Sequence, residues 1–413
     1  MKKVYLDNAA TTSVDPSVFA AMKPYFSVKY GNASEPHIWG QEARQVVEKS
    51  RETIANFLNA KPSEIYFTGC ATESINLAHK GLLEAKLREF SNSNPSTSSG
   101  QVFQFSKKKP HIITTSIEHK AVLETCNHLE KAGMATVTYL PVDHFGLIDL
   151  KQLEKKIRPE TVLVSVMYVN NEVGTVEPIE EVGQLIKKIN ESRIAKKESR
   201  IYFHTDATQA MQYFDCDVNK LNVDLLSFTG HKFYAPKGIG ALYLRTGTPL
   251  VRQIDGGGQE KRLRAGTENV PYIVALAKAL ELVSSKFKVQ SSKLIESRDF
   301  LIKEMLKIKD VELTGHPEKR APHIASFVVK GVEGEAMLLM LSDKGIAAAS
   351  GSACTSGVLS PSHVLLAMGI APEVAHGSMR FSLGKDTTKE DIDYVIKTFP
   401  SIVERLRLMA PKL

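Results

Sequence analysis

The chain has 413 residues, of which 43% are hydrophobic and 24% charged, with a formal net charge of +7 at pH 7. This length is enough for two domains with a large buried core, and the composition is that of an ordinary globular protein. The basic residues are spread among acidic ones and no RNP, zinc-finger or basic-helix motif occurs, so we expect no nucleic-acid partner. No apolar run is long enough to cross a bilayer, and Asp7 and Asn8 interrupt the N-terminal segment, so we expect neither a membrane span nor a signal peptide.

The cysteines are scattered and form no CxxC pair; they are Cys70, Cys126, Cys216 and Cys354. This spacing argues against a disulfide framework and against a structural zinc site. We therefore expect a cytoplasmic protein in which the thiols stay reduced.

Short β-rich runs alternate along the chain with amphipathic stretches. The predicted strands are Ile65–Thr68, His111–Ser116, Thr136–Pro141, Thr161–Tyr168, Ile201–His204, Leu225–Thr229 and Gly240–Leu244. The predicted helices between them include Glu73–Arg88, Ala121–Ala132, Leu150–Ile157 and Ile179–Ile189. This alternation predicts an α/β domain with a mainly parallel, seven-stranded sheet.

The pattern changes after about Gly266, which predicts a second, smaller α+β domain. A long helical pattern, Tyr272–Lys307, precedes a short strand around Ile324–Val329 and a loop that carries a cysteine. We place the large domain at residues 14–262 and the small domain at residues 1–13 together with 263–413. The serine-rich stretch at about residues 91–110 ends in lysines and predicts a flexible surface loop inserted in the large domain.

Lys232 and Asp206 each end a predicted strand region. A lysine that forms a Schiff base and an aspartate that pairs with a pyridinium nitrogen are the two groups that pyridoxal phosphate chemistry needs. Each residue alone is more often a solvated residue at the rim of a sheet. The prediction of a cofactor site therefore depends on what the other strand ends supply.

Two further strand ends carry polar groups that suit a flat, phosphorylated ligand. The segment Gly69–Ser74 opens a helix, so its N–H groups and Thr72 could bind a phosphate, or Thr72 could simply cap the helix. His119 could stack on a ring and move protons, or it could be an ordinary surface or core histidine. Because ligands bind at the carboxyl ends of parallel strands, these segments are expected to meet there.

Amide and thiol groups complete the set of candidate site residues. Asn170 and Asn171 could donate to a phenolate or a carboxylate, or form a turn, and Gln209 could reach the same oxygen. Cys354 lies in a loop rich in glycine and serine, where a reactive thiolate is more expected than in a core. Arg380 could hold a substrate carboxylate through two hydrogen bonds or form an exposed ion pair.

Taken together, these motifs resemble those of cysteine desulfurases of the NifS/IscS type, in the class V aminotransferase group of fold-type I pyridoxal phosphate enzymes. The resemblance runs from Tyr5 to Gly384. Its motifs are Ala-Thr-Glu-Ser at 71–74, Glu-His-Lys at 118–120, Asn-Asn-Glu at 170–172, Asp-Ala-Thr-Gln at 206–209, Gly-His-Lys at 230–232 and Gly-Ser-Ala-Cys at 351–354.

The resemblance implies a role for each matching residue. Lys232 would bind pyridoxal 5'-phosphate covalently, Asp206 would pair with its ring nitrogen, and His119 would stack on the ring as an acid and base. The other implied ligands are Asn171 and Gln209 for the phenolic oxygen, Ala71, Thr72, Thr229 and His231 for the phosphate, Thr267 for the phosphate of the neighbouring subunit of a homodimer, and Asn170 and Arg380 for the substrate carboxylate.

The resemblance also implies the reaction. L-Cysteine would yield alanine, and the nucleophile Cys354 would keep the sulfur as a persulfide for an iron–sulfur scaffold protein of the NifU/IscU type, for tRNA thiolation or for another acceptor. The alternatives are a selenocysteine lyase, another class V aminotransferase-like enzyme, and an inactive sulfur carrier with the same fold. No resident metal is implied, although Cys354 as a transient iron–sulfur ligand stays open.

Overall fold

A central sheet organises the larger part of the molecule. The computed structural model describes residues 2–92, 109–196, 198–351 and 360–409. Among these residues, seven strands form one sheet in the order β2-β8-β7-β6-β5-β3-β4. β8 runs antiparallel to β2 and β7, and the other neighbouring pairs are parallel. The strands are β2 (Ile65–Thr68), β3 (His111–Thr115), β4 (Thr136–Leu140), β5 (Thr161–Ser165), β6 (Tyr202–Asp206), β7 (Leu225–Thr229) and β8 (Gly240–Leu244). The predicted α/β fold with a mainly parallel sheet is confirmed.

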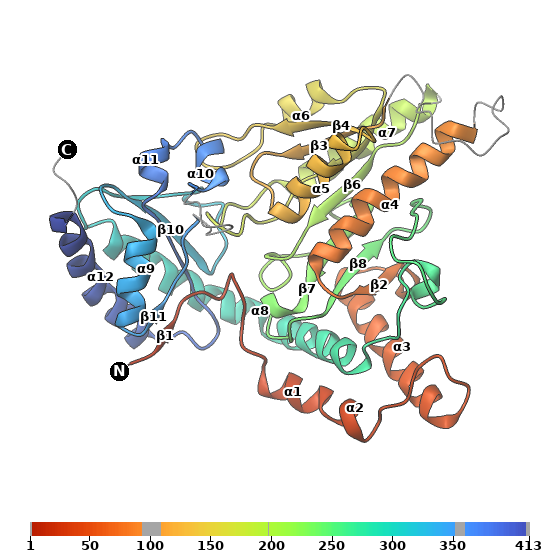
Figure 1. Cartoon of the computed structure of the whole chain (residues 1–413), viewed down its shortest axis with the longest axis horizontal. Helices are drawn as coiled ribbons and strands as arrows, with labels where there is room; N and C mark the ends of the chain where they lie inside the picture. The colour runs from red at the N-terminus through yellow and green to blue at the C-terminus, as the bar shows by residue number, and fades with distance from the viewer. Residues whose placement is uncertain (1, 93–108, 197, 352–359, 410–413) are drawn as a thin grey trace.

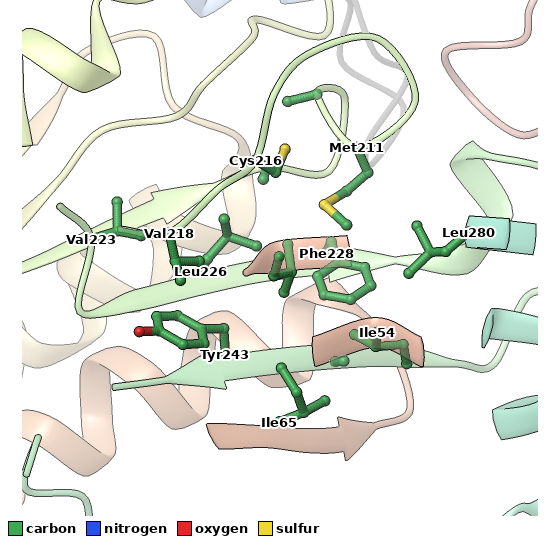
Figure 2. Packing of buried hydrophobic residues seen from close by; sticks show 14 of the residues in the cluster. Ile54, Ile65, Met211, Cys216, Val218, Val223, Leu226, Phe228, Tyr243 and Leu280 are labelled. Atoms are coloured by element: carbon green, nitrogen blue, oxygen red, sulfur yellow. The ribbon is translucent and has the colours of Figure 1, made fainter. Parts of the chain in front are cut away.

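Helices bury both faces of this sheet, and every strand except the edge strand β4 is buried along its whole length. One face packs against α4 (Ala71–Asn92) and α5 (Lys120–Lys131), and the other packs against α3 (Ile38–Leu58), α7 (Ile179–Ala195) and the first part of α8 (Val270–Met305). Neighbouring residues of one strand enter different cores: Leu225 packs on the α4 side and Leu226 on the α3 side. Figure 2 shows Leu226 of β7 near Tyr243 of β8 in the α3-side core.

A second core lies beside the first and contains residues from the first and the last described segments of the chain. Its sheet has the order β12-β10-β9, with both pairs antiparallel, and β1 pairs in parallel with β11. Val4 and Leu6 of the N-terminal segment belong to this core. The strands are β1 (Val4–Tyr5), β9 (Val311–Leu313), β10 (Ile324–Val329), β11 (Ile346–Ala347) and β12 (Ser378–Ser382), and the helices are α9 (Gly334–Asp343), α10 (His363–Ala367), α11 (Pro372–Ala375) and α12 (Lys389–Met409).

The long helix α8 joins the two cores (Figure 1). Ile273 and Leu280 near its start belong to the core of the large sheet, whereas Leu301 and Met305 near its end belong to the small core. The expected boundary near Arg262 therefore does not separate the two cores, and the exact domain limits remain a prediction. The remaining helices are α1 (Pro16–Met22), α2 (Pro24–Ser27) and α6 (Leu150–Lys156).

Two segments named in the sequence analysis lie outside the described residues. They are residues 93–108, most of the expected insertion, and residues 352–359, which include Cys354. Among the helices that the structure describes, none combines the length and the apolar character needed to cross a bilayer.

Candidate active site

A cavity of about 220 Å³ lies where the carboxyl ends of the parallel strands meet the start of α4. This is the position at which open α/β sheets bind ligands. All the predicted cofactor ligands except Thr267 are in its wall: Ala71, Thr72, His119, Asn171, Asp206, Gln209, Thr229, His231 and Lys232. The fold thus brings together side chains from segments as far apart in the sequence as Ala71 and Lys232.

Lys232 ends the short 3₁₀ turn Gly230–Lys232 (η2), which directly follows β7. Its Nζ donates to the carbonyl oxygens of Ala9 at 2.7 Å and Ala10 at 2.8 Å. Burial and the charge of Arg380 together lower the pKa of this amine to about 8, although the charges of Asp206 and Asp7 oppose them. Because only the neutral amine attacks a carbonyl, the lowered pKa makes Lys232 a better nucleophile near neutral pH.

Asp206 is the last residue of β6 and only 6% of it is exposed. Its Oδ1 accepts the backbone N–H of Thr208 at 2.9 Å, which fixes the carboxylate at the cavity wall. β6 extends two residues beyond the predicted end at His204, and this extension carries Asp206 to the edge of the cavity.

Gln209 connects Asp206's loop to the N-terminal segment and to the small domain. Its Nε2 donates to the carbonyl oxygen of Ala9 at 2.9 Å, and its Oε1 lies 3.3 Å from Nε2 of His323. Burial lowers the pKa of His323 to about 3, so its neutral ring donates to the amide oxygen. His323 and Ala9 support the site, and no sequence motif singled them out.

His119 caps the N-terminus of α5 with its side chain. Its Nδ1 accepts the backbone N–H of Ala121 at 3.1 Å, so a neutral ring carries its proton on Nε2. Burial lowers the pKa of His119, and the charge of Lys232 acts in the same direction, although Asp206 opposes it. The ring can therefore donate a proton from Nε2 into the cavity.

The start of α4 forms the end of the cavity that suits a phosphate. The helix begins at Ala71, so Thr72 lies in its first turn and is not the cap. The Thr72 side chain is exposed and lines the cavity. A helix of 22 residues presents unpaired N–H groups and a partial positive charge at this end. These groups would bind an anion without a charged side chain.

Two predicted phosphate ligands are partly engaged with the protein itself. The Thr229 hydroxyl donates to the carbonyl oxygen of Ile239 at 2.9 Å. Nδ1 of His231 lies 3.2 Å from the Thr11 hydroxyl, and burial lowers the pKa of His231 to about 4. His231 would therefore meet a phosphate as a neutral donor, and Thr229 would have to turn its hydroxyl.

The structure gives the two predicted carboxylate ligands different surroundings. Asn170 is fully buried: its Nδ2 donates to Ile117 O at 2.9 Å and its Oδ1 accepts from the N–H groups of Glu172 and Val173. These hydrogen bonds hold the turn and tie it to the segment before His119, so the assignment of Asn170 to the substrate carboxylate stays a prediction that would require some of them to break. Asn171, the next residue, faces the cavity instead.

Arg380 of β12 lines a second cavity of about 440 Å³, which shares His119 and Asn171 with the first. Its guanidinium donates to Asn171 O at 2.6 Å and to Oδ1 of Asp7 at 2.8 Å. The Nε atom is buried and has no hydrogen-bond partner within the described residues. Arg380 therefore borders the second cavity, and its role as a ligand of the substrate carboxylate stays a prediction.

Thr267 is not among the described residues that line the cofactor cavity. Thr267 lines a separate cavity of about 210 Å³ behind Gly69, so it does not reach the first cavity from within the same chain. Cys354 lies outside the described residues. The flanking Gly351 and Ser362 both line the second cavity beside Arg380. Among the described residues, no three histidine, cysteine or acidic side chains group as a metal site.

The residues of the first cavity fit pyridoxal 5'-phosphate. The Lys232 amine, whose pKa burial lowers, suits the aldehyde of the cofactor. The buried carboxylate of Asp206 suits a protonated ring nitrogen. The exposed Thr72 hydroxyl at the start of α4 suits its phosphate. These features occupy different parts of one cavity wall, as one ligand with three such groups requires.

Known proteins resemble this chain over nearly its whole length. The family described as Aminotransferase class-V matches residues 4–92 and 98–395. A cysteine desulfurase IscS of Methanosarcina thermophila is 45% identical over 410 residues, which is 99% of this chain and 94% of that protein. Its counterpart in Dictyoglomus turgidum is 46% identical over 411 residues, covering 99% of this chain and 97% of that protein.

Solved structures agree with this similarity. A structure titled NifS-like protein has a TM-score of 0.86 and 38% identity, and covers 98% of this chain and 100% of its own. The crystal structure of DndA from Streptomyces lividans has a TM-score of 0.73 and 34% identity, covering 92% of this chain and 99% of its own.

The fold and the site define a fold-type I enzyme that depends on pyridoxal 5'-phosphate, and the chain belongs to the aminotransferase class-V family. Within that family it is a cysteine desulfurase of the NifS/IscS type. The resemblance drawn from the motifs, together with the cofactor that it implied, is confirmed.

Proposed function

We propose that this protein removes sulfur from L-cysteine, releases alanine and keeps the sulfur as a persulfide on Cys354. The observation that carries the proposal is the meeting of Lys232, Asp206 and His119 in one cavity. The adjoining cavity is bordered by Arg380 and by the residues that flank the cysteine-bearing segment. Cofactor and thiol chemistry would therefore take place side by side.

The protein groups divide the work by position and charge. When bound, the cofactor supplies an aldehyde that captures an amine and a ring that accepts electrons. Lys232, once its amine is free, takes the α-proton of the substrate at Nζ, and its lowered pKa leaves it neutral enough to do so. Asp206 would pair with the ring nitrogen and keep it protonated, and His119 would supply a proton from Nε2.

Arg380 binds the carboxylate of the substrate in this proposal. Its unpartnered Nε and the two nitrogens now directed at Asp7 and Asn171 offer a planar set of donors at the second cavity. A carboxylate matches such a set with two parallel hydrogen bonds. Asn171, which faces both cavities, would contact the phenolic oxygen of the cofactor.

A homodimer is part of the proposal, with Thr267 completing the phosphate site of the partner subunit. Thr267 lies apart from the cofactor cavity of its own chain. The segment around α1 and α2, at the lower end of the molecule in Figure 1, exposes an unusual number of large apolar side chains. Exposed apolar patches of this kind mark protein–protein contacts. The side chains are Phe19, Phe26, Val28, Tyr30, Ile38 and Trp39.

The sulfur acceptor is proposed by class. Relatives at about the same identity carry the name IscS, which supports an iron–sulfur scaffold of the NifU/IscU type, with tRNA thiolation as the other outlet. The scattered cysteines favour the cytoplasm as the place of action.

Alanine formation tests the proposal directly. The purified holoenzyme, its Cys354→Ser variant and its Lys232→Ala variant are each given L-cysteine and L-selenocysteine. We expect alanine from L-cysteine with the wild type and with neither variant. Alanine from selenocysteine alone would identify a selenocysteine lyase, and sulfur delivery by Lys232→Ala would identify an inactive carrier.

A further inference from the structure

Glu118 is a buried acid next to His119 that the proposed reaction does not use. It lies in the connection between β3 and α5 and is fully buried. Its Oε1 accepts the backbone N–H of Met167 at 2.7 Å and the Thr115 hydroxyl at 3.2 Å. Its Oε2 has no hydrogen-bond partner within the described residues. A carboxylate with one bare oxygen is costly in such a place, because burial penalises an unpaired charge.

The surroundings of Glu118 favour its uncharged form. Burial raises the pKa of Glu118 well above its usual range, and the hydrogen bonds to Oε1 oppose this only in part. The negative charges of Asp206, from β6, and Glu177, from the segment after β5, raise it further. The thiol of Cys126 on α5 also faces it, and burial raises the pKa of that thiol to about 12.

Glu118 belongs to a set of links that fix the chain before His119. The carbonyl oxygen of Ile117 accepts from Nδ2 of Asn170 at 2.9 Å. The carbonyl oxygen of Glu118 lies 3.0 Å from Nε2 of His363 on α10. The Glu118 side chain adds a link to the backbone that continues β5. The position of the His119 ring therefore depends on all three neighbours.

We propose that Glu118, in its uncharged form, is a positioning residue that ties the backbone of His119 to the end of β5 and adds no second negative charge beside Asp206. The inference rests on the role proposed for His119 in the proposed function. A glutamine has the same shape and can accept the Met167 N–H equally well. A leucine cannot, and it leaves that N–H buried without an acceptor.

Glutamine and leucine variants separate this role from a merely structural one. Glu118→Gln and Glu118→Leu are compared with Glu177→Gln and Glu177→Leu. Glu177 is a matched control because it is also buried and accepts one backbone N–H, from Ile148 at 3.2 Å. Burial also raises the pKa of Glu177, to about 8. The readouts are the NMR titration of the His119 ring in the apoprotein, identified with His119→Gln, thermal unfolding, and kcat and KM for alanine formation.

We expect Glu118→Gln to leave the midpoint of the His119 titration unchanged. Its kcat and KM should stay within about twofold of the wild-type values. Glu118→Leu should displace the His119 resonances and lower kcat about tenfold or more with little change in KM. Glu177→Leu should lower the unfolding temperature without moving the His119 titration, and Glu177→Gln should change neither. These results would support the proposal.

A titration midpoint of His119 that moves in Glu118→Gln would overturn it, because that result requires a charged Glu118. Unchanged His119 resonances in Glu118→Leu would also overturn it. If Glu118→Leu does not fold, the glutamine variant still decides the charge state. A His119→Gln enzyme with normal turnover would reject the proposed function of His119, while the NMR titration would still report whether Glu118 positions the ring.

Discussion

At the scale of single residues, burial sets the charge state of the site. It lowers the pKa values of Lys232 and His119 and raises that of Glu118. Burial thus favours the uncharged forms of the Lys232 amine, the His119 imidazole and the Glu118 carboxyl around Asp206. This arrangement suits a cofactor whose ring nitrogen must stay protonated while nearby groups exchange protons.

The lowered pKa of Lys232 predicts how cofactor loading depends on pH. Only the neutral amine captures the aldehyde, so the rate of loading of the apoprotein should rise through about pH 8 and then level off. An ordinary lysine would show this rise near its unperturbed pKa of about 10.4. The absorbance change on adding pyridoxal 5'-phosphate at a series of pH values measures it. A rate that is flat through this range, or that rises only near the ordinary value, would contradict the burial argument.

Residue roles could be predicted from the sequence where a strong apolar run ends in a polar group, as at Asp206 and Lys232. The choice between Asn170 and Asn171 could not be predicted, because both are amides in the same turn. Hydrogen bonds to the backbone distinguish the two, because they occupy Asn170. His323 could not be predicted either, because it reaches the site from a segment more than 100 residues away from Gln209.

At the scale of elements, the strand order brings the loop after β2 against β8. A Cβ added to Gly240, at the start of β8, would lie 2.7 Å from Phe228 O and 2.8 Å from the carbonyl carbon of Cys70. Both neighbours are backbone atoms, so no change of side-chain rotamer can relieve the overlap. Glycine at this position therefore lets the segment that opens α4 lie close to the sheet.

We predict that Gly240→Ala displaces the start of α4 and weakens cofactor binding. Overpacking costs about 1–3 kcal/mol, so the dissociation constant of pyridoxal 5'-phosphate should rise about tenfold. Gly258→Ala is the control, because its added Cβ would meet an ordinary contact at 3.9 Å. Equilibrium titration of the two apoproteins measures the effect. Equal affinity in both variants would show that this contact does not position the phosphate end.

The edge strand β2 is covered by a buried ion pair. Glu260 accepts the backbone N–H of Phe67 at 2.9 Å and two hydrogen bonds from Arg51, each at 2.8 Å. Glu260 also begins a run of three non-glycine residues with positive φ, Glu260, Lys261 and Arg262. Such backbone is strained and persists only where surrounding contacts hold it.

We predict that Arg51→Met lowers the free energy of unfolding by about 3–5 kcal/mol, because Glu260 would stay buried without its partner. Arg88→Met, which breaks an exposed pair with Glu84 at 2.6 Å, should cost about 1 kcal/mol or less. Urea denaturation of both variants measures the difference. Similar losses in the two would mean that burial adds nothing to the Arg51 pair.

At the scale of the whole molecule, two cores share α8 and the N-terminal segment, and the site lies between them. Ala9 binds Lys232 and Gln209 of the large domain, while Asp7, two residues earlier, binds Arg380 of the small domain. The alternation of strands and helices predicted the large sheet well. It could not predict that α8 serves both cores, because apolar residues recur along the whole helix and do not show which core each turn enters.

The exposed apolar side chains around α2 lead to a prediction about assembly. Tyr30→Glu together with Ile38→Glu should convert the proposed homodimer to a monomer and weaken cofactor retention, because Thr267 of the partner would be lost. Leu408→Glu, at a side chain that is 81% exposed on α12, should leave the assembly unchanged. Sedimentation and cofactor absorbance measure both effects. A monomeric wild type, or a dimer that survives the double change, would reject this interface.

The most direct test of the central claim is the location of the sulfur after turnover. The holoenzyme is given L-cysteine, and its exposed thiols are then blocked by alkylation. The protein is digested, and the mass of each cysteine-containing peptide is measured by mass spectrometry. The account predicts one added sulfur on the Cys354 peptide. Cys126 and Cys216 should carry none, because burial raises their pKa values far above neutral pH. Sulfur on Cys70, which lines the cofactor cavity, or on no cysteine at all, would contradict the account.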